Sequence, residues 1–152
     1  MVSADPIAGL LLILAGAAGI LTLLLPWKPA DPRLPAYGSK TGWDLFVIGH
    51  SQQLSAGDSL ALYAVLGIAV AGGACVVLGL AMFAPIDHLP LGAVTLLLGV
   101  ATTGGVLWWF FHGRGAAGGL RAMFSQTQVG WYLALGAGIV EVAGAIKALA
   151  TP

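Results

Sequence analysis

The sequence predicts an all-α membrane protein, a four-transmembrane-helix bundle with a long first loop and a shorter third loop on one face. Four long apolar runs predict it, at residues 7–25, 59–83, 89–111 and 129–149, and only the last contains charged residues. A helix rises about 1.5 Å per residue, so each run could cross a hydrocarbon core of about 30 Å. Of the 152 residues, 59% are hydrophobic and 8% charged, so we expect one transmembrane domain over residues 1–152.

Proline and aspartate mark where the predicted helices begin and end. Asp5 followed by Pro6 is typical of an N-cap with proline at the first helical position. Pro26 ends the first run. Residues 84–88 form a short link, and Pro90 falls in the first turn of the third helix, so the second and third helices should form an antiparallel hairpin.

The loops divide unequally between the two faces. Residues 26–58 form a segment too long to be only a connector, and residues 112–128 form a second loop. With four spans, these two loops emerge on one face and both termini on the other. Within them, residues 42–49 are apolar enough for a short strand or interfacial helix, and residues 120–124 for a short amphipathic piece.

Aromatic residues gather where the predicted helices meet the loops. Tryptophan is enriched at the boundary between lipid and water, so we expect interface anchors at Trp27, Trp43, Trp108, Trp109 and Trp131. For Trp43, the alternative is contact with a partner protein.

Three short motifs suggest a relationship. Leu-Pro-Trp closes the first span at residues 25–27, Gly-Trp-Asp follows at 42–44, and Gly-Trp-Tyr-Leu opens the last span at 130–133. In these motifs the chain resembles a diffuse group of small, mostly uncharacterised four-span membrane proteins of actinobacteria and related bacteria. The resemblance implies a cytoplasmic N-terminus, with the first and third loops facing outward and packed on each other.

Charge argues for the opposite orientation. Five of the six basic residues fall in the loops, and the positive-inside rule would place them in the cytoplasm. They are Lys28, Arg33, Lys40, Arg114 and Arg121. We follow the resemblance and expect a multi-pass protein of the plasma membrane with both loops extracytoplasmic.

Small residues recur along the predicted helices at intervals of about one turn, which favours close helix packing in lipid. They are Gly67, Ala71, Cys75 and Gly79 in the second run, Gly99 in the third, and Gly130, Ala134 and Gly138 in the fourth. These stripes would hold the bundle together. The alternative is that one stripe docks a partner helix.

Glu141 lies near the middle of the fourth run, where a carboxylate without a partner costs several kcal/mol. Thr102, Thr103 or Tyr63 could reach it. One interpretation is a proton or cation relay. The other is a neutral, hydrogen-bonded acid that fixes helix register or pairs with another subunit.

Other chemistry has little support. The formal net charge is zero and the basic residues are scattered, which argues against a nucleic-acid partner. His50 and His112 share the loop face but form no recognised metal motif, so we expect neither metal nor cofactor.

By elimination, the sequence predicts a non-enzymatic accessory or structural subunit of a larger membrane complex. Its partners would be membrane lipids and either other integral membrane subunits or further copies of itself. The first alternative is a small oligomeric proton or cation transporter or channel that uses Glu141. The second is a metal- or cofactor-associated subunit of a membrane enzyme.

Overall fold

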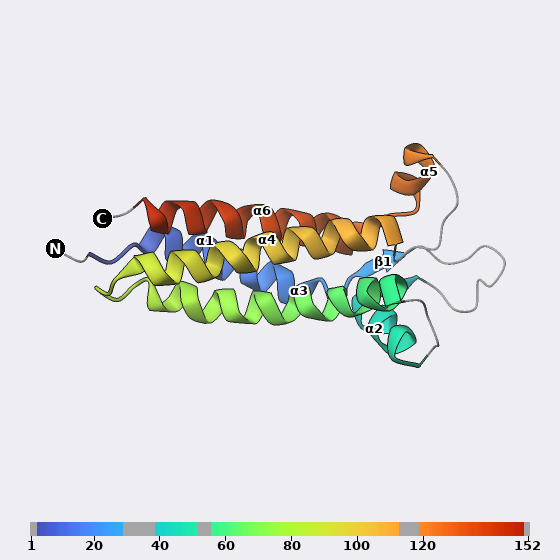
Figure 1. The fold of residues 1–152 in the computed structure, drawn as a ribbon, viewed down its shortest axis with the longest axis horizontal. Coiled ribbons are helices and arrows are strands. Elements are labelled where there is room, and N and C mark those ends of the chain that lie inside the picture. The colour runs from blue at the N-terminus through green and yellow to red at the C-terminus, as the bar shows by residue number, and fades with distance from the viewer. Residues whose placement is uncertain (1–2, 29–38, 52–55, 113–118, 151–152) are drawn as a thin grey trace.

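The computed structural model describes residues 3–28, 39–51, 56–112 and 119–150. In chain order its elements are α1 (Pro6–Leu21), β1 (Pro26–Lys28), β2 (Lys40–Thr41), α2 (Gly42–Ser51), α3 (Ala56–Ala81), α4 (His88–His112), α5 (Leu120–Ser125) and α6 (Val129–Leu149). The four long helices lie along a common axis (Figure 1). The chain ends and the link between α3 and α4 lie at one end of this bundle, and β1, α2 and α5 lie at the other, here called the loop end.

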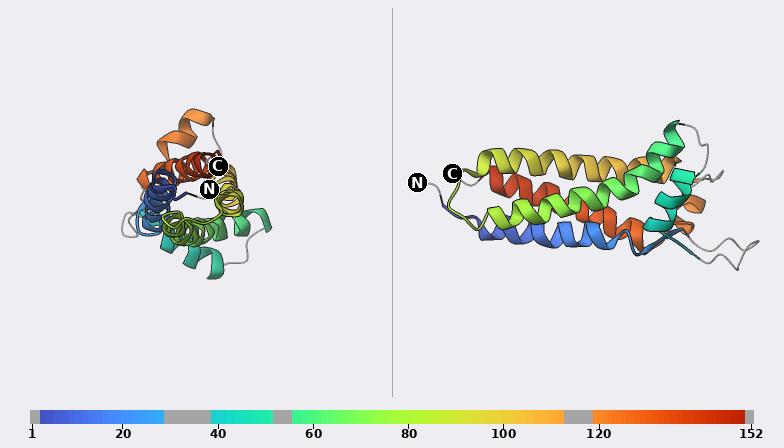
Figure 2. Two further views of the ribbon diagram at one scale, coloured as in Figure 1. Left: turned by 90° about the vertical axis from the view of Figure 1, so that its left-hand side faces the viewer. Right: turned by 90° about the horizontal axis from the view of Figure 1, so that it is seen from below.

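The long helices form a ring. Helix α1 packs on α3 and α6, and α4 packs on the same two helices from the other side. The end-on view shows this arrangement (Figure 2). Because consecutive long helices run in opposite directions, the N-terminus of α1 lies beside the C-terminus of α6.

Among the described residues, three helices are long and apolar enough to cross a membrane, namely α3 from Ser59 to Ala81, α4 and α6. The predicted bounds of these helices hold to within three residues, and those of α6 hold throughout. The structure thus agrees with an integral membrane protein with a helical bundle.

The prediction of a first helix over residues 7–25 is wrong at its C-terminal end. Helix α1 has 16 residues and stops at Leu21. The chain then turns, because Leu23 and Leu24 donate backbone hydrogen bonds to the carbonyls of Ile20 and Leu21. This turn brings the indole of Trp27 back, where its Nε1 donates to the carbonyl of Thr22 at 2.8 Å. The helix therefore ends in a turn, closed by a hydrogen bond between residues five apart, before its apolar run does.

The first loop contains more structure than a connector. Strands β1 and β2 pair antiparallel, with Pro26 opposite Thr41. Helix α2 follows directly, so of the two alternatives for residues 42–49, a short strand or a helix, the structure has the helix. Its start is a reciprocal cap: the backbone N–H of Asp44 donates to Thr41 Oγ1 at 3.2 Å, and the N–H of Thr41 donates to Asp44 Oδ2 at 3.0 Å. The short helix expected near residues 120–124 is α5.

Glycines let α1 and α3 approach until their backbones touch. A Cβ added at Gly79 would lie 2.8 Å from the carbonyl oxygen of Gly9, and one added at Gly72 would lie 2.6 Å from that of Gly16. Side chains larger than hydrogen do not fit at either position. Helices α4 and α6 approach in the same way, since a Cβ at Gly99 would lie 2.9 Å from the backbone nitrogen of Val142.

Candidate functional site

Glu141 is buried at the centre of the bundle. It lies two residues beyond the midpoint of α6, and its exposed fraction is 0%. Within the described part of the chain, no hydrogen-bond partner reaches either oxygen of its carboxyl group. An ionised carboxylate in such apolar surroundings would cost several kcal/mol, so the site favours the neutral acid.

Two polar side chains from other helices face this carboxyl group. Thr102 of α4 and Cys75 of α3 are within interaction range of Glu141, although neither meets hydrogen-bond geometry. Thr102 is 2% exposed and Cys75 is fully buried. Three helices thus each contribute one polar group to a small cluster inside the bundle.

The Thr102 hydroxyl differs from those of the other threonines of α4 in its hydrogen bonding. Thr95 and Thr103 donate to carbonyls four residues earlier in the helix, those of Leu91 and Gly99, both at 2.9 Å. Such bonds are the usual way for a helical threonine to satisfy its hydroxyl. Thr102 makes none, and its Oγ1 is buried without a partner among the described residues.

Of the three partners predicted for Glu141, only Thr102 lies in range. The hydroxyl of Thr103 is occupied by the Gly99 carbonyl. Tyr63 lies near the loop end, where its ring contacts that of Phe46 with centroids 5.8 Å apart. It precedes Cys75 by twelve residues, about 18 Å along α3, so it cannot reach the cluster.

The predicted small-residue stripe of α3 divides between different faces of the helix. Gly79 lies against Gly9 of α1, and Cys75 faces the bundle interior. Ala71 is half-buried, while Gly67 is exposed and a Cβ there would meet nothing within 4 Å. Each four-residue step turns about 40° past a full turn, so such a stripe drifts around the helix.

On α4 and α6, the predicted small residues lie at helix contacts. A Cβ added at Gly138 would lie 3.1 Å from the backbone nitrogen of Thr103, and one at Gly99 would lie 3.1 Å from Cβ of Glu141. These two contacts hold α4 against α6 beside the buried carboxyl group. Ala134 is fully buried nearer the loop end, and Gly130 lies beneath the ring of Trp27.

Three of the five expected interface tryptophans lie inside the bundle, which corrects their predicted role. Trp27, Trp109 and Trp131 are buried, and the rings of Trp27 and Trp109 meet edge to face with centroids 5.0 Å apart. Trp131 Nε1 donates to the carbonyl of Val106 at 3.0 Å. Hydropathy marks the depth of an aromatic residue but not whether it faces lipid or protein.

The other two, Trp43 and Trp108, are 49% and 40% exposed at the loop end, so an interface position for them stays a prediction. The ring of Trp108 stacks on His112 with centroids 4.2 Å apart. The side chain of His50 lies outside the described residues. Within the described ranges, no group of three His, Cys, Asp or Glu residues could hold a metal ion.

An ion pair joins α1 and α6 at the end of the bundle opposite the loops. Lys147 Nζ lies 2.9 Å from Asp5 Oδ2, and Asp5 also accepts a hydrogen bond from the N–H of Ala8 at 3.0 Å. Sequence reasoning assigned Asp5 only the capping role. The sequence does contain a signal for the ion pair. Because an even number of spans brings the chain back to the side where it started, the start of the first helix and the end of the last lie on the same face.

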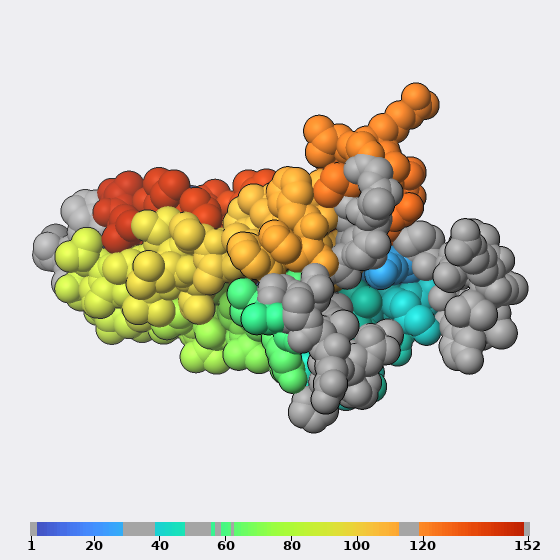
Figure 3. All heavy atoms as spheres, turned by 45° about the vertical axis from the view of Figure 1, so that its right-hand side comes forward, coloured from blue at the N-terminus to red at the C-terminus, as the bar shows by residue number. Residues whose placement is uncertain are grey.

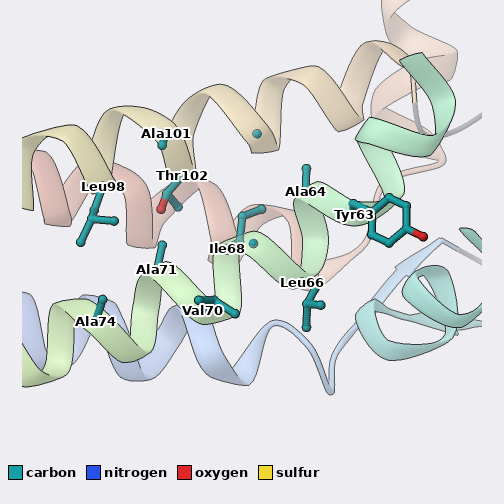
Figure 4. A pocket seen from close by; sticks show the side chains of 12 residues that line it. Tyr63, Ala64, Leu66, Ile68, Val70, Ala71, Ala74, Leu98, Ala101 and Thr102 are labelled. Atoms are coloured by element: carbon teal, nitrogen blue, oxygen red, sulfur yellow. The ribbon is translucent and has the colours of Figure 1, made fainter. Parts of the chain in front are cut away.

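A groove lies between α3 and α4 on the outside of the bundle. Its volume is about 500 Å³, and half of its lining residues have no side chain beyond Cβ. These are Ala64, Gly67, Ala71, Ala74, Ala101 and Gly105. Thr102 also lines it, so the groove leads to the polar cluster, and Figure 4 shows the Thr102 side chain pointing from α4 toward α3.

Comparisons with protein-family models, with curated proteins and with solved structures give no match. The resemblance to the four-span group therefore stays a prediction.

Proposed function

We propose that this protein is a four-span, non-enzymatic accessory or structural subunit of a larger assembly in the plasma membrane. The observation that carries the proposal is the exposed position of α5. This helix projects from the bundle at the loop end, as the ribbon and space-filling views show (Figures 1 and 3). None of its residues is buried, and Leu120 and Phe124 are exposed. Exposed apolar groups on a projecting element are typical of a surface that a partner covers.

The fourth span is α1 together with the turns that follow it. Sixteen helical residues measure about 24 Å, less than the hydrocarbon core, but residues 22–25 continue the apolar run. The bilayer can thin locally around a short span at modest cost. Packing of α1 along both α3 and α6 also supports a position within the membrane.

The proposed orientation places β1, α2 and α5 outside the cell, as the resemblance implies. Contacts between the two loop segments support their acting as one surface. The backbone N–H of Gln128 donates to the carbonyl of Trp27 at 3.2 Å, and α6 begins against β1. A partner would then meet α5 and α2 on the outer face.

Photo-crosslinking in intact cells tests the accessory role. A photoreactive amino acid is placed at Leu120 in α5 and, in a matched variant, at Ile139 of α6, which is similarly exposed but lies along the bundle. The proposal predicts one discrete adduct with the same membrane protein at Leu120 and none at Ile139. Equal adducts at both positions, or none at Leu120, would contradict it.

A transporter is the second candidate, favoured by the buried cluster of Glu141, Thr102 and Cys75. An oligomer would create the pathway, and Glu141 of each copy would carry the proton or cation. Flux into liposomes that contain the purified protein tests this candidate. Glu141→Gln should abolish the flux, whereas unchanged flux, or none from the wild type, would exclude it.

A further inference from the structure

The groove between α3 and α4 combines two features that packing inside the bundle does not explain. The first is its lining of small residues. Where glycines of α3 allow close packing against another helix, as at Gly72 and Gly79, an added Cβ would clash with the backbone of α1. At Gly67 an added Cβ would meet nothing within 4 Å. The missing side chain there leaves open space in the groove.

The second feature is an unused hydrogen-bond donor. Thr102 lines the groove, its side chain is almost fully buried, and its hydroxyl has no partner among the described residues. Behind it lies the Glu141 carboxyl group, whose two oxygens also have no hydrogen-bond partner among the described residues. Saturated hydrocarbon offers nothing to either group, while a carbonyl oxygen would accept a hydrogen bond.

From these features we propose that the groove binds a lipid-soluble molecule with a long apolar chain and a carbonyl group. The carbonyl oxygen accepts a hydrogen bond from Thr102, and the chain lies over Gly67 and Ala71 toward the lipid. The proposal is independent of the accessory role. It fits the volume, because about 500 Å³ lies within the range of sites for small ligands.

Depth distinguishes this ligand from an ordinary phospholipid. Thr102 lies two residues beyond the midpoint of α4, so it is near the middle of the hydrocarbon core. The ester carbonyls of a phospholipid stay at the boundary with the headgroups and do not reach this depth. A quinone ring or a ketone within an apolar chain does. A transmembrane helix, about 10 Å across, would lie over a groove of this size instead of filling it.

A long-chain alkyl benzophenone is a suitable probe, because its ketone is both the carbonyl group to be bound and the photoreactive group. The purified full-length protein in lipid nanodiscs is illuminated with the probe, and peptide mass spectrometry locates the label. We expect saturable labelling of the α3 and α4 residues around Thr102. A long-chain quinone should compete with the label, and added phosphatidylcholine should not.

Two variants and two matched controls test the assignment. Gly67→Leu fills the groove and should reduce labelling at least tenfold. Thr102→Val keeps the shape of the side chain but removes the hydrogen-bond donor. It should raise the probe concentration needed for half-maximal labelling about fivefold, as expected for the loss of one hydrogen bond. Gly136→Leu, at an exposed helical glycine that also has open space, and Thr103→Val, whose hydroxyl is already bonded to Gly99, should leave labelling unchanged.

Each contrary result overturns the proposal. Label scattered over all lipid-facing helices, or equal labelling of wild type and Gly67→Leu, would mean that the groove selects no ligand. Competition by phosphatidylcholine would mean that the groove is a general contact for lipids and does not select the proposed ligand. Absence of label from the wild type would leave the groove to a transmembrane helix of another chain.

Discussion

Lys147 in the last turn of α6 forms an ion pair with Asp5 at the start of α1, with 2.9 Å between Nζ and Oδ2. The aspartate is 3% exposed and the lysine 43% exposed, so the pair lies at the edge of the bundle. It joins the two ends of the described chain, 142 residues apart, on the face opposite the loops.

Asp5 performs two tasks that substitutions can separate. Asp5→Asn keeps an N-cap for α1 but loses the ion pair, and should lower the free energy of unfolding by up to about 1 kcal/mol. Asp5→Ala loses the cap as well and should cost about 1 kcal/mol more. Thermal unfolding in detergent measures both. Equal stability of the two variants would show that the cap contributes nothing.

Two adjacent glycines of α3 should respond in opposite directions to the same change. Gly72→Ala places a methyl group 2.6 Å from the carbonyl of Gly16 and should force α1 and α3 apart, with a cost of about 1–3 kcal/mol. Gly73→Ala meets nothing within 4 Å and should stabilise the helix by up to about 1 kcal/mol. Unfolding midpoints compare them, and a stable Gly72→Ala variant would contradict the packing described.

The burial of Trp27 predicts a large effect of its removal. Trp27→Ala leaves a cavity beside Trp109 and above Gly130, and should cost about 3–5 kcal/mol. Trp43→Ala is the matched control, because the side chain of Trp43 is 49% exposed, and it should change stability by less than about 1 kcal/mol. If the two losses are similar, Trp27 is not a core residue.

The uncharged state of Glu141 has a spectroscopic signature. Infrared spectra of the reconstituted protein at neutral pH should contain the carbonyl stretch of a protonated carboxylic acid. Glu141→Gln should remove that band while the protein stays folded, since the amide is neutral and nearly isosteric with the acid. A wild-type spectrum without the band would show that the carboxyl group is ionised and has a partner that the described residues do not supply.

The sequence was informative where lipid determines the structure. Length and hydropathy define α3, α4 and α6, because in the absence of water a backbone must satisfy its own hydrogen bonds. Local capping signals also held, since Asp5 caps α1 as predicted. Both kinds of signal depend on residues close together in the chain.

Two features of the packing were missed. The turn after Leu21 follows from the burial of Trp27, which no local pattern reveals. Gly72, which contacts Gly16, lies outside the four-residue stripe that was singled out. It is seven residues before Gly79, and seven residues return to nearly the same face of a helix, whereas repeated steps of four do not.

The polar cluster was predictable only in part. Glu141 could be singled out because a carboxyl group in an apolar run is unusual. Which residue faces it depends on the rotation of α4 about its axis, and adjacent threonines at 102 and 103 look equivalent in sequence. The structure separates them, because Thr103 lies against Gly138 and Thr102 faces Glu141.

The sidedness of single cysteines tests the four-span arrangement most directly. Cysteine is introduced singly at Ser3, before α1, at Ile86, in the link between α3 and α4, and at Ser125, at the end of α5; all three are exposed, whereas the native Cys75 is buried. A membrane-impermeant maleimide is then added to intact and to permeabilised cells. Four spans with outward loops predict that Ser125→Cys is labelled in intact cells, and that Ser3→Cys and Ile86→Cys are labelled only after permeabilisation. Labelling of Ser3→Cys and Ser125→Cys from the same side would show that α1 does not cross the membrane and would contradict the account.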